Sequence, residues 1–224
     1  MRVLAVGAHP DDVELGCGAS LKLLKDLGHK VYILVLTKGE ASGDPKIRES
    51  ECELAGRRLC VDKVFFGNLQ DTKISDGIET ISEIEKVIDA THSDVIFAHG
   101  YKDQHQDHRN ASRATMSAAR NAKKVLLFES PAALRDFTPQ VFIDVTLTFN
   151  AKLEALEAFG TQATKVYFRG NNEKLNRDES RHFPYVSNAV EGLARYRGFQ
   201  AGVALAEAFE VGKFVWSISR NDER

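Results

Sequence analysis

Cysteine is scarce in this sequence: the 224 residues include three, Cys17, Cys52 and Cys60. Their number is odd and no two of them form a CxxC pair, which argues against a disulfide framework and against a cysteine-rich metal site. Reduced thiols are typical of cytoplasmic proteins, so we expect a cytoplasmic location.

Long apolar runs and blocks of one charge are also missing. The apolar run at residues 3–6 is too short for a signal-peptide core, and no later run is long enough to span a bilayer. The 30 basic and 32 acidic residues nearly balance, and neither sign forms a block of the kind that attracts nucleic acid or a membrane surface. We therefore expect no nucleic-acid partner and no membrane insertion, and a small molecule fits best as the partner.

What the sequence does contain is a regular alternation of strand-like apolar runs with stretches of helical periodicity. Parallel strands joined by crossover helices are the usual product of such an order. The chain is 43% hydrophobic and can bury one continuous core, so we predict a single α/β domain over residues 1–224. We expect strands at residues 2–6, 31–36, 64–66, 95–98, 125–128, 142–145 and 214–218, helices at 13–27, 47–59, 78–90, 109–121, 151–159 and 188–209, and a flexible surface loop at 169–185.

A polar cluster, Ala-His-Pro-Asp-Asp at residues 8–12, follows the first expected strand. Ligands of open α/β sheets bind beyond the carboxyl ends of the strands. A hydrolytic metal ion takes imidazole and carboxylate ligands and keeps one position open, so His9 and Asp12 can supply two of three protein ligands. Asp11 then remains free to take a proton from water. The alternative is a helix cap, since Asp11 followed by Glu14 resembles a capping box, and both interpretations can hold together.

A second cluster, His-Gln-Asp-His at residues 105–108, lies just beyond the strand expected at 95–98. Because both clusters follow parallel strands, we expect them to meet at one edge of the sheet. We interpret His108 as the third metal ligand. We expect Asp107 to hydrogen-bond His105 and raise its pKa, so that an imidazolium stabilises the oxyanion and protonates the departing amine. The alternative, a polar surface loop over residues 102–110, does not explain why both clusters share one edge.

The other four histidines lie at the ends of expected elements or in the polar loop. We expect each to be solvated or to cap a helix, because histidine readily serves a helix C-terminus. They are His29, His92, His99 and His182.

The sequence from Ala8 to Gly18, together with residues 105–108, resembles the zinc-dependent LmbE-like deacetylase family, also called the PIG-L family. Further similarities extend almost end to end, at residues 37–40, Arg48 and Glu51, 152–156, 196–198 and 206–209. The resemblance implies a Rossmann-like three-layer α/β/α sandwich with a mostly parallel sheet. It also implies Zn²⁺ on His9, Asp12 and His108, Asp11 as the general base, and His105 with Asp107 as the electrostatic and acid partner.

Two further implications concern the substrate and the assembly. By resemblance Arg48 contacts a hydroxyl or an anionic group of the substrate, whereas the alternative is an ordinary surface arginine. Phe159 and Thr161 depart from the family pattern, in which many relatives have His and Ser, so sugar recognition by this segment does not carry over. The resemblance suggests a trimer or hexamer, and another divalent metal such as Fe²⁺ is an alternative to zinc.

These features predict a metal-dependent hydrolase that removes an N-acetyl or other acyl group from a small amino sugar or glycoconjugate, such as an N-acetylglucosamine derivative. One alternative is a metal amidohydrolase that acts on a non-sugar acylated amine. Another is a protein that binds metal or sugar without catalysis, against which the free carboxylate of Asp11 argues. A nucleotide-binding module is disfavoured, because the glycines form neither GxGxxG nor GxxxxGK.

Overall fold

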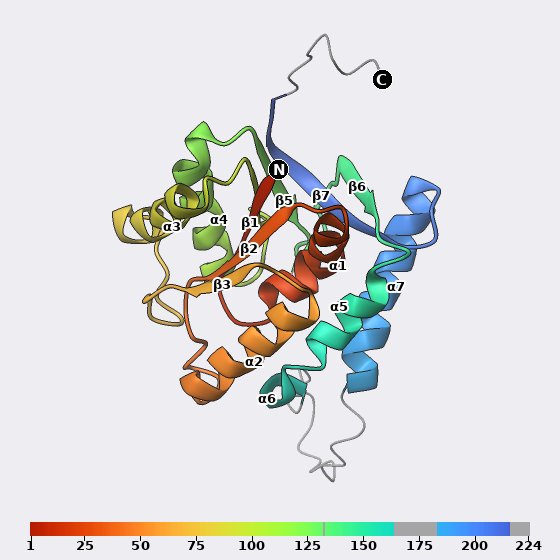
Figure 1. Cartoon of the computed structure of the whole chain (residues 1–224), viewed down its shortest axis with the longest axis horizontal. Coiled ribbons are helices and arrows are strands. Elements are labelled where there is room, and N and C mark those ends of the chain that lie inside the picture. The colour runs from red at the N-terminus through yellow and green to blue at the C-terminus, as the bar shows by residue number, and fades with distance from the viewer. Residues whose placement is uncertain (132, 164–182, 216–224) are drawn as a thin grey trace.

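A single seven-stranded sheet organises the chain (Figure 1). The computed structural model describes residues 1–131, 133–163 and 183–215, and within them the strand order is β3-β2-β1-β4-β5-β7-β6. The strands are β1 (Arg2–Gly7), β2 (Lys30–Val35), β3 (Lys63–Phe66), β4 (Val95–His99), β5 (Lys124–Phe128), β6 (Val141–Asp144) and β7 (Ala206–Phe214).

Helices cover both faces of this sheet. Figure 1 shows α3 and α4 on one side and α1, α2, α5 and α7 on the other. This is the three-layer α/β/α sandwich that the family resemblance implies, and the predicted fold class is confirmed. The helices are α1 (Asp12–Asp26), α2 (Pro45–Arg58), α3 (Ile78–Thr91), α4 (Gln106–Ala118), the 3-10 turn η1 (Ala119–Asn121), α5 (Phe149–Leu156), α6 (Gly160–Ala163) and α7 (Phe183–Ala201).

The central strands are apolar on both faces because both faces are covered. In β1, Val3 and Ala5 belong to the core cluster under α1, α2 and α5, whereas Leu4 and Val6 belong to the cluster under α3 and α4. A strand buried on both sides is a continuous apolar run without alternation, as expected for a parallel sheet. The first strand could therefore be predicted from its apolar run alone.

The sheet is parallel over β3, β2, β1, β4 and β5, and antiparallel where β7 pairs with β5 and β6. The prediction of a helix at 188–209 is wrong in its last part, because α7 ends at Ala201 and Gly202 takes a positive φ of 74°. Residues 206–209 instead begin β7, where Phe209 pairs with Phe128 of β5. A short apolar run fits a strand or a helix equally well, and here the pairing partners decide.

Two other predictions need adjustment near the C-terminal end. The strand expected at 214–218 overlaps β7 only at Phe214, where β7 ends; Val215 is not in a strand, and residues 216–218 lie outside the described residues. Of the loop expected at 169–185, residues 169–182 also lie outside them, whereas residues 183–185 form the first turn of α7.

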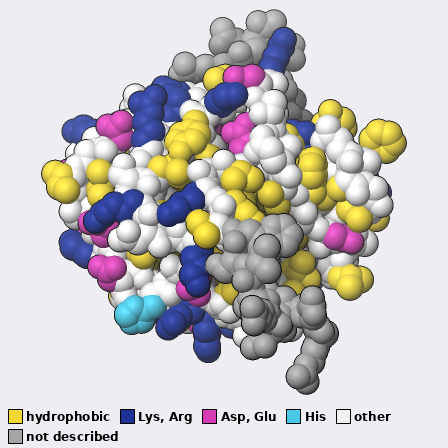
Figure 2. Space-filling view, turned by 90° about the horizontal axis from the view of Figure 1, so that it is seen from above, with side chains coloured by type: hydrophobic (Ala, Val, Ile, Leu, Met, Phe, Trp, Pro, Cys, Tyr) yellow, Lys and Arg dark blue, Asp and Glu magenta, His cyan; other side chains and the backbone are white. Residues whose placement is uncertain are grey.

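The surface mixes charges of both signs. Figure 2 shows basic and acidic side chains interspersed on the face in view. Among the described residues, no helix has the length and apolar character needed to cross a membrane.

Candidate metal centre

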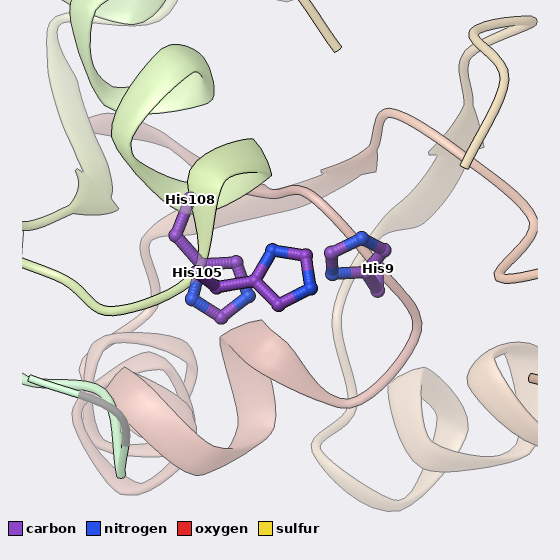
Figure 3. A group of neighbouring side chains, drawn as sticks. All are labelled: His9, His105 and His108. Carbon is purple, nitrogen blue, oxygen red and sulfur yellow. The ribbon is translucent and has the colours of Figure 1, made fainter. Parts of the chain in front are cut away.

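The two polar clusters meet where β1 and β4 lie side by side. From β1 the sheet continues to β2 and β3 in one direction, and from β4 it continues to β5 in the other. Such a switch point leaves a crevice at the carboxyl ends of the strands. His9 lies in the turn from β1 to α1, and His105 and His108 lie at the start of α4. Figure 3 shows the three imidazole rings gathered at this place.

The structure brings the three predicted metal ligands together around Asp12. One carboxylate oxygen, Oδ2, lies 3.3 Å from Nδ1 of His9 and accepts the His9 backbone N–H at 2.7 Å. The other, Oδ1, lies 3.2 Å from Nε2 of His108. Each ring therefore has one nitrogen beside the Asp12 carboxylate, on separate oxygens, and two imidazoles with a carboxylate are a donor set that zinc and similar ions bind.

The far nitrogen of His108 is held by a buried carboxylate that the sequence analysis missed. Nδ1 of His108 lies 3.0 Å from Oδ2 of Asp103. Asp103 is itself fixed, since it also accepts the backbone N–H of His105 at 2.7 Å and the hydroxyl of Ser130. A ligand histidine whose second nitrogen is bonded to a carboxylate is the usual arrangement at metal sites.

His9 has a similar arrangement. Its Nε2 lies 3.2 Å from Oδ2 of Asp107 and 3.2 Å from Oδ1 of Asp71. Asp71 was also missed, because it lies in the loop after β3, far from the two motifs in sequence. Its place beyond the carboxyl end of a parallel strand is the signal that could have identified it.

The expected side-chain hydrogen bond from Asp107 to His105 is wrong. The Asp107 side chain is fully buried, and its Oδ2 meets His9 and accepts the Thr72 backbone N–H at 2.8 Å. Only the backbone N–H of Asp107 contacts His105, donating to Nδ1 at 3.2 Å. The pKa of His105 is accordingly lowered, by burial and by the charge of His108, and not raised as predicted.

Carboxylates raise the pKa of both rings that are predicted to bind the metal. Burial lowers the pKa of His9, but hydrogen bonds to Asp107 and Asp12 outweigh it and raise the pKa to about 12. Burial also lowers the pKa of His108, but Asp12 and Asp103 raise it to about 10. The site therefore concentrates negative charge around two rings, and a divalent ion that binds here would displace their protons.

Asp11 stands beside this cluster in an unusual backbone conformation. Its φ of 101° is in the left-handed region, which residues with a Cβ rarely adopt. Its side chain makes no capping hydrogen bond, so the capping box proposed as an alternative does not form. Burial and the charge of Asp12 raise the pKa of Asp11 to about 7. Burial likewise raises the pKa of Glu14 to about 8.

Arg48 is buried, so the alternative of a surface arginine is wrong. Its Nη2 donates to the backbone oxygen of Pro10 at 2.8 Å, and its Nη1 donates to that of Gly39 at 3.1 Å and to the Ser42 hydroxyl. Nη2 also lies 3.9 Å from Oδ2 of Asp11. The guanidinium thus fastens the turn that carries His9 and Asp11 to the loop after β2.

His99 is also not the solvated or capping residue that we predicted. It is 1% exposed, and its Nε2 lies 3.1 Å from the Ala8 backbone nitrogen and 3.1 Å from Oδ2 of Asp12. Its ring stacks on His108 with centroids 4.0 Å apart. Burial and the charge of His108 lower the pKa of His99 to about 4. His92, by contrast, ends α3 with a φ of 50°, as a capping residue does.

Within the described part of the chain, three overlapping triplets of side chains have ligand atoms no more than 4.8 Å apart. His9 occurs in two of them and His108 in two, and the predicted set of His9, Asp12 and His108 is not itself one of the three. The triplets are His9, His105 and His108; Asp12, His99 and His108; and His9, Asp71 and Asp107.

Comparison with known proteins identifies the family. The sequence model described as "PIG-L: GlcNAc-PI de-N-acetylase" matches residues 4–119, which include both polar clusters. The chain belongs to the PIG-L family. The resemblance predicted from residues 8–18 and 105–108 is therefore confirmed, and the chain is a member of a deacetylase family.

One curated relative and two solved structures are similar to this chain. "Uncharacterized deacetylase YaiS" of Escherichia coli (strain K12) is 37% identical over 165 residues, which cover 69% of this chain and 88% of the relative. The conserved protein TT1542 from Thermus thermophilus has a TM-score of 0.81 at 26% identity, over 98% of this chain and 99% of that one. N,N'-diacetylchitobiose deacetylase from Pyrococcus horikoshii shares the fold, with a TM-score of 0.75 at 21% identity over 94% and 83% of the two chains.

Proposed function

We propose that this chain is a metal-dependent N-deacetylase that hydrolyses the acyl group of a small N-acetylated amino sugar or glycoconjugate. The observation that carries the proposal is the convergence of His9, Asp12 and His108 beside Asp11, whose carboxylate makes no capping bond. Membership of the PIG-L family supports the reaction class, and a chitobiose deacetylase among the structures of the same fold supports an amino-sugar substrate.

The ion would be held by Nδ1 of His9, the Asp12 carboxylate and Nε2 of His108. We expect Zn²⁺, with Fe²⁺ as the alternative, since three nitrogen and oxygen ligands with an open position suit both. A bound divalent ion supplies Lewis acidity, which polarises the amide carbonyl and lowers the pKa of water.

Asp11 is the residue we propose as the general base. A pKa raised to about 7 lets its carboxylate take a proton from the attacking water near neutral pH and pass it on later. Arg48 holds the Pro10 carbonyl next to this residue. We therefore propose that Arg48 serves the reaction by fixing the turn, because its Nη1 and Nη2 groups already have protein partners.

His105 is the proposed hydrogen-bond donor to the oxyanion, and the departing amine takes the proton that Asp11 removes from water. Its Nδ1 accepts the backbone N–H of Asp107, so the proton of a neutral ring lies on Nε2. The ring is exposed at the site and can donate from Nε2 to the substrate. Asp107 acts through His9 in this scheme, since its carboxylate contacts that ring.

Substrate choice depends on groups beyond this centre. Phe159, which departs from the family pattern, is buried in the core cluster under α1, α2 and α5 and offers no group to a sugar. Thr161 donates its hydroxyl to Glu51. A non-sugar acylated amine is therefore the alternative substrate class.

The test is amine release from a panel of N-acetylated amino sugars and non-sugar N-acetylated amines. Metal-stripped protein is assayed with and without added zinc, and Asp11→Asn serves as the blank. Zinc-dependent release from amino sugars, absent in the variant, supports the proposal. Release from the non-sugar amines alone would assign the alternative substrate class, and tight zinc binding without any release would favour a non-catalytic metal-binding protein.

A further inference from the structure

The side chain of His99 has no assigned role, yet it is the most deeply buried imidazole of the site. His99 is the last residue of β4. The centroid of its ring lies 4.0 Å from that of His108 and 4.7 Å from that of Phe128. Its backbone oxygen accepts the Ser112 hydroxyl of α4 at 2.6 Å. The backbone of His99 is therefore held by α4, and its ring is held by the stacked ring of His108 and the tilted ring of Phe128.

The nitrogen Nε2 of this ring meets two groups. The Ala8 backbone N–H lies 3.1 Å away and the Asp12 Oδ2 lies 3.1 Å away. A single ring nitrogen cannot accept from the amide and donate to the carboxylate at the same time. Nδ1, on the other side, has no hydrogen-bond partner among the described residues.

The position of the proton follows from these contacts. A proton on Nδ1 would leave a buried donor without an acceptor and would turn the Nε2 lone pair toward the Asp12 carboxylate. A proton on Nε2 leaves the Ala8 amide without this acceptor, but it gives a hydrogen bond to a charged oxygen. The Nδ1–H form leaves one buried N–H without an acceptor and sets a lone pair against a carboxylate, whereas the Nε2–H form leaves the Ala8 N–H and the Nδ1 lone pair without partners. The Nε2–H form alone gains a hydrogen bond to a charged oxygen, and a charge-assisted hydrogen bond is about twice as strong as a neutral one. The form with Nε2–H is favoured.

The consequence concerns the metal ligand Asp12. Its Oδ2 receives the backbone N–H of His9 at 2.7 Å and the Nε2–H of His99 at 3.1 Å. Two donors on Oδ2 fix the rotation of the carboxylate and leave Oδ1 directed at Nε2 of His108. The stacked ring of His99 also limits the tilt of His108.

We propose that His99 is a positioning residue of the metal centre, which fixes the Asp12 carboxylate through Nε2–H and supports the His108 ring by stacking. This inference rests on the proposed metal site. Residues that orient metal ligands change metal affinity by about 10- to 100-fold when they are replaced.

The experiment compares His99→Phe, His99→Gln and His99→Asn. Phe keeps a ring against His108 and removes the polar atoms. Gln places an amide near the position of Nε2, whereas the shorter Asn reaches only the position of Nδ1. The readouts are the zinc Kd from competition with a chelator, the visible absorption spectrum of the Co²⁺-substituted protein, and the Tm of the metal-stripped protein.

We expect His99→Phe to raise the zinc Kd by about 10- to 100-fold and to change the Co²⁺ spectrum, without lowering the Tm of the stripped protein. We expect His99→Gln to stay closer to the wild-type Kd than His99→Asn does. If His99→Phe has the zinc Kd and the Co²⁺ spectrum of the wild type, His99 contributes only to core packing and the proposal is overturned. If the Phe variant does not fold, equal Kd values for the Gln and Asn variants would overturn it as well.

These outcomes separate the inference from the proposed reaction. If the wild-type protein binds zinc but releases no amine, the deacetylase proposal fails, whereas the order of Kd values still tests His99. If the wild-type protein binds neither zinc nor Co²⁺, both proposals fail.

Discussion

At the scale of single residues, the backbone of Asp11 defines which substitution can test its role. A left-handed φ of 101° suits asparagine better than alanine, so Asp11→Asn removes the acid and preserves the turn. We expect this variant to bind zinc with a Kd near that of the wild type and to lose about 10²- to 10⁴-fold in kcat, the range that a general base supplies. Zinc titration and amine release measure the two quantities, and a matching loss of zinc affinity would show that Asp11 is a ligand.

Asp103 offers a second test at this scale, because it holds Nδ1 of His108 at 3.0 Å. We expect Asp103→Asn to raise the zinc Kd by about 10- to 100-fold, since the ring loses its charged partner. Asp136→Asn is the matched control, with a side chain that is 63% exposed and paired only with Lys102 among the described ion pairs. Competition with a chelator gives both zinc Kd values. An unchanged zinc Kd for Asp103→Asn would show that Asp103 does not support metal binding through His108.

At the scale of secondary-structure elements, the N-terminal part of α1, which carries Asp12, is packed tightly against the sheet. A Cβ on Gly16 would lie 2.2 Å from the Phe128 ring of β5, and the helix leaves helical geometry at the next residue, Cys17. We expect Gly16→Ala to lower the Tm, because α1 must shift away from the sheet. Gly192→Ala is the control, since a Cβ there meets nothing within 4 Å in the middle of α7. Alanine should stabilise that helix by about 1 kcal/mol. Equal Tm changes in the two variants would contradict this packing.

The junction of α1 and β2 has a pH-dependent contact at Asp62. Its carboxylate accepts from Lys25 at 2.7 Å, from the Val31 backbone N–H at 2.8 Å and from Lys30 at 3.0 Å. Burial raises the pKa of Asp62, but these donors outweigh it and lower the pKa from 3.8 to about 2. A lowered pKa means that the stabilisation is complete above about pH 4 and is lost as the pH falls toward 2.

We therefore expect Asp62→Asn to lower the Tm at pH 7 and to have a much smaller effect near pH 2. Thermal unfolding of the metal-stripped protein across this range measures the difference. A Tm difference that stays constant from pH 7 to pH 2 would show that the ionised carboxylate contributes nothing at this junction.

At the scale of the whole molecule, the parallel strands and β6 follow from the sequence, whereas most of β7 does not. Buried parallel strands such as β1 and β4 are continuous apolar runs between helical stretches, and these local patterns suffice. Strand β7 depends on pairing with β5 and β6, which no local pattern encodes, so residues 206–209 were predicted to be helical. The expected trimer or hexamer and the cytoplasmic location stay predictions.

The residues of the site also divide into those that the sequence predicts and those that it does not. His9, Asp11, Asp12, His105 and His108 could be predicted because they lie in two compact motifs at strand ends. His99 and Asp103 could not, because they reach the site through strand and loop packing and lack a motif of their own. Asp71 was missed, although its place after a parallel strand could have identified it. The partner of Asp107 was predicted wrongly for a related reason: its side chain lies buried in the first turn of α4 and meets His9, whose position depends on β1.

The central claim is that His9, Asp12 and His108 hold one ion that the hydrolysis requires. The most direct measurement adds zinc stepwise to metal-stripped protein while amine release from an N-acetylated amino sugar is followed, for the wild type and for His108→Ala. The account predicts that release by the wild type rises until about one ion is bound per chain, and that His108→Ala shows neither tight zinc binding nor release. Amine release that is independent of zinc, or unchanged in His108→Ala, would contradict it.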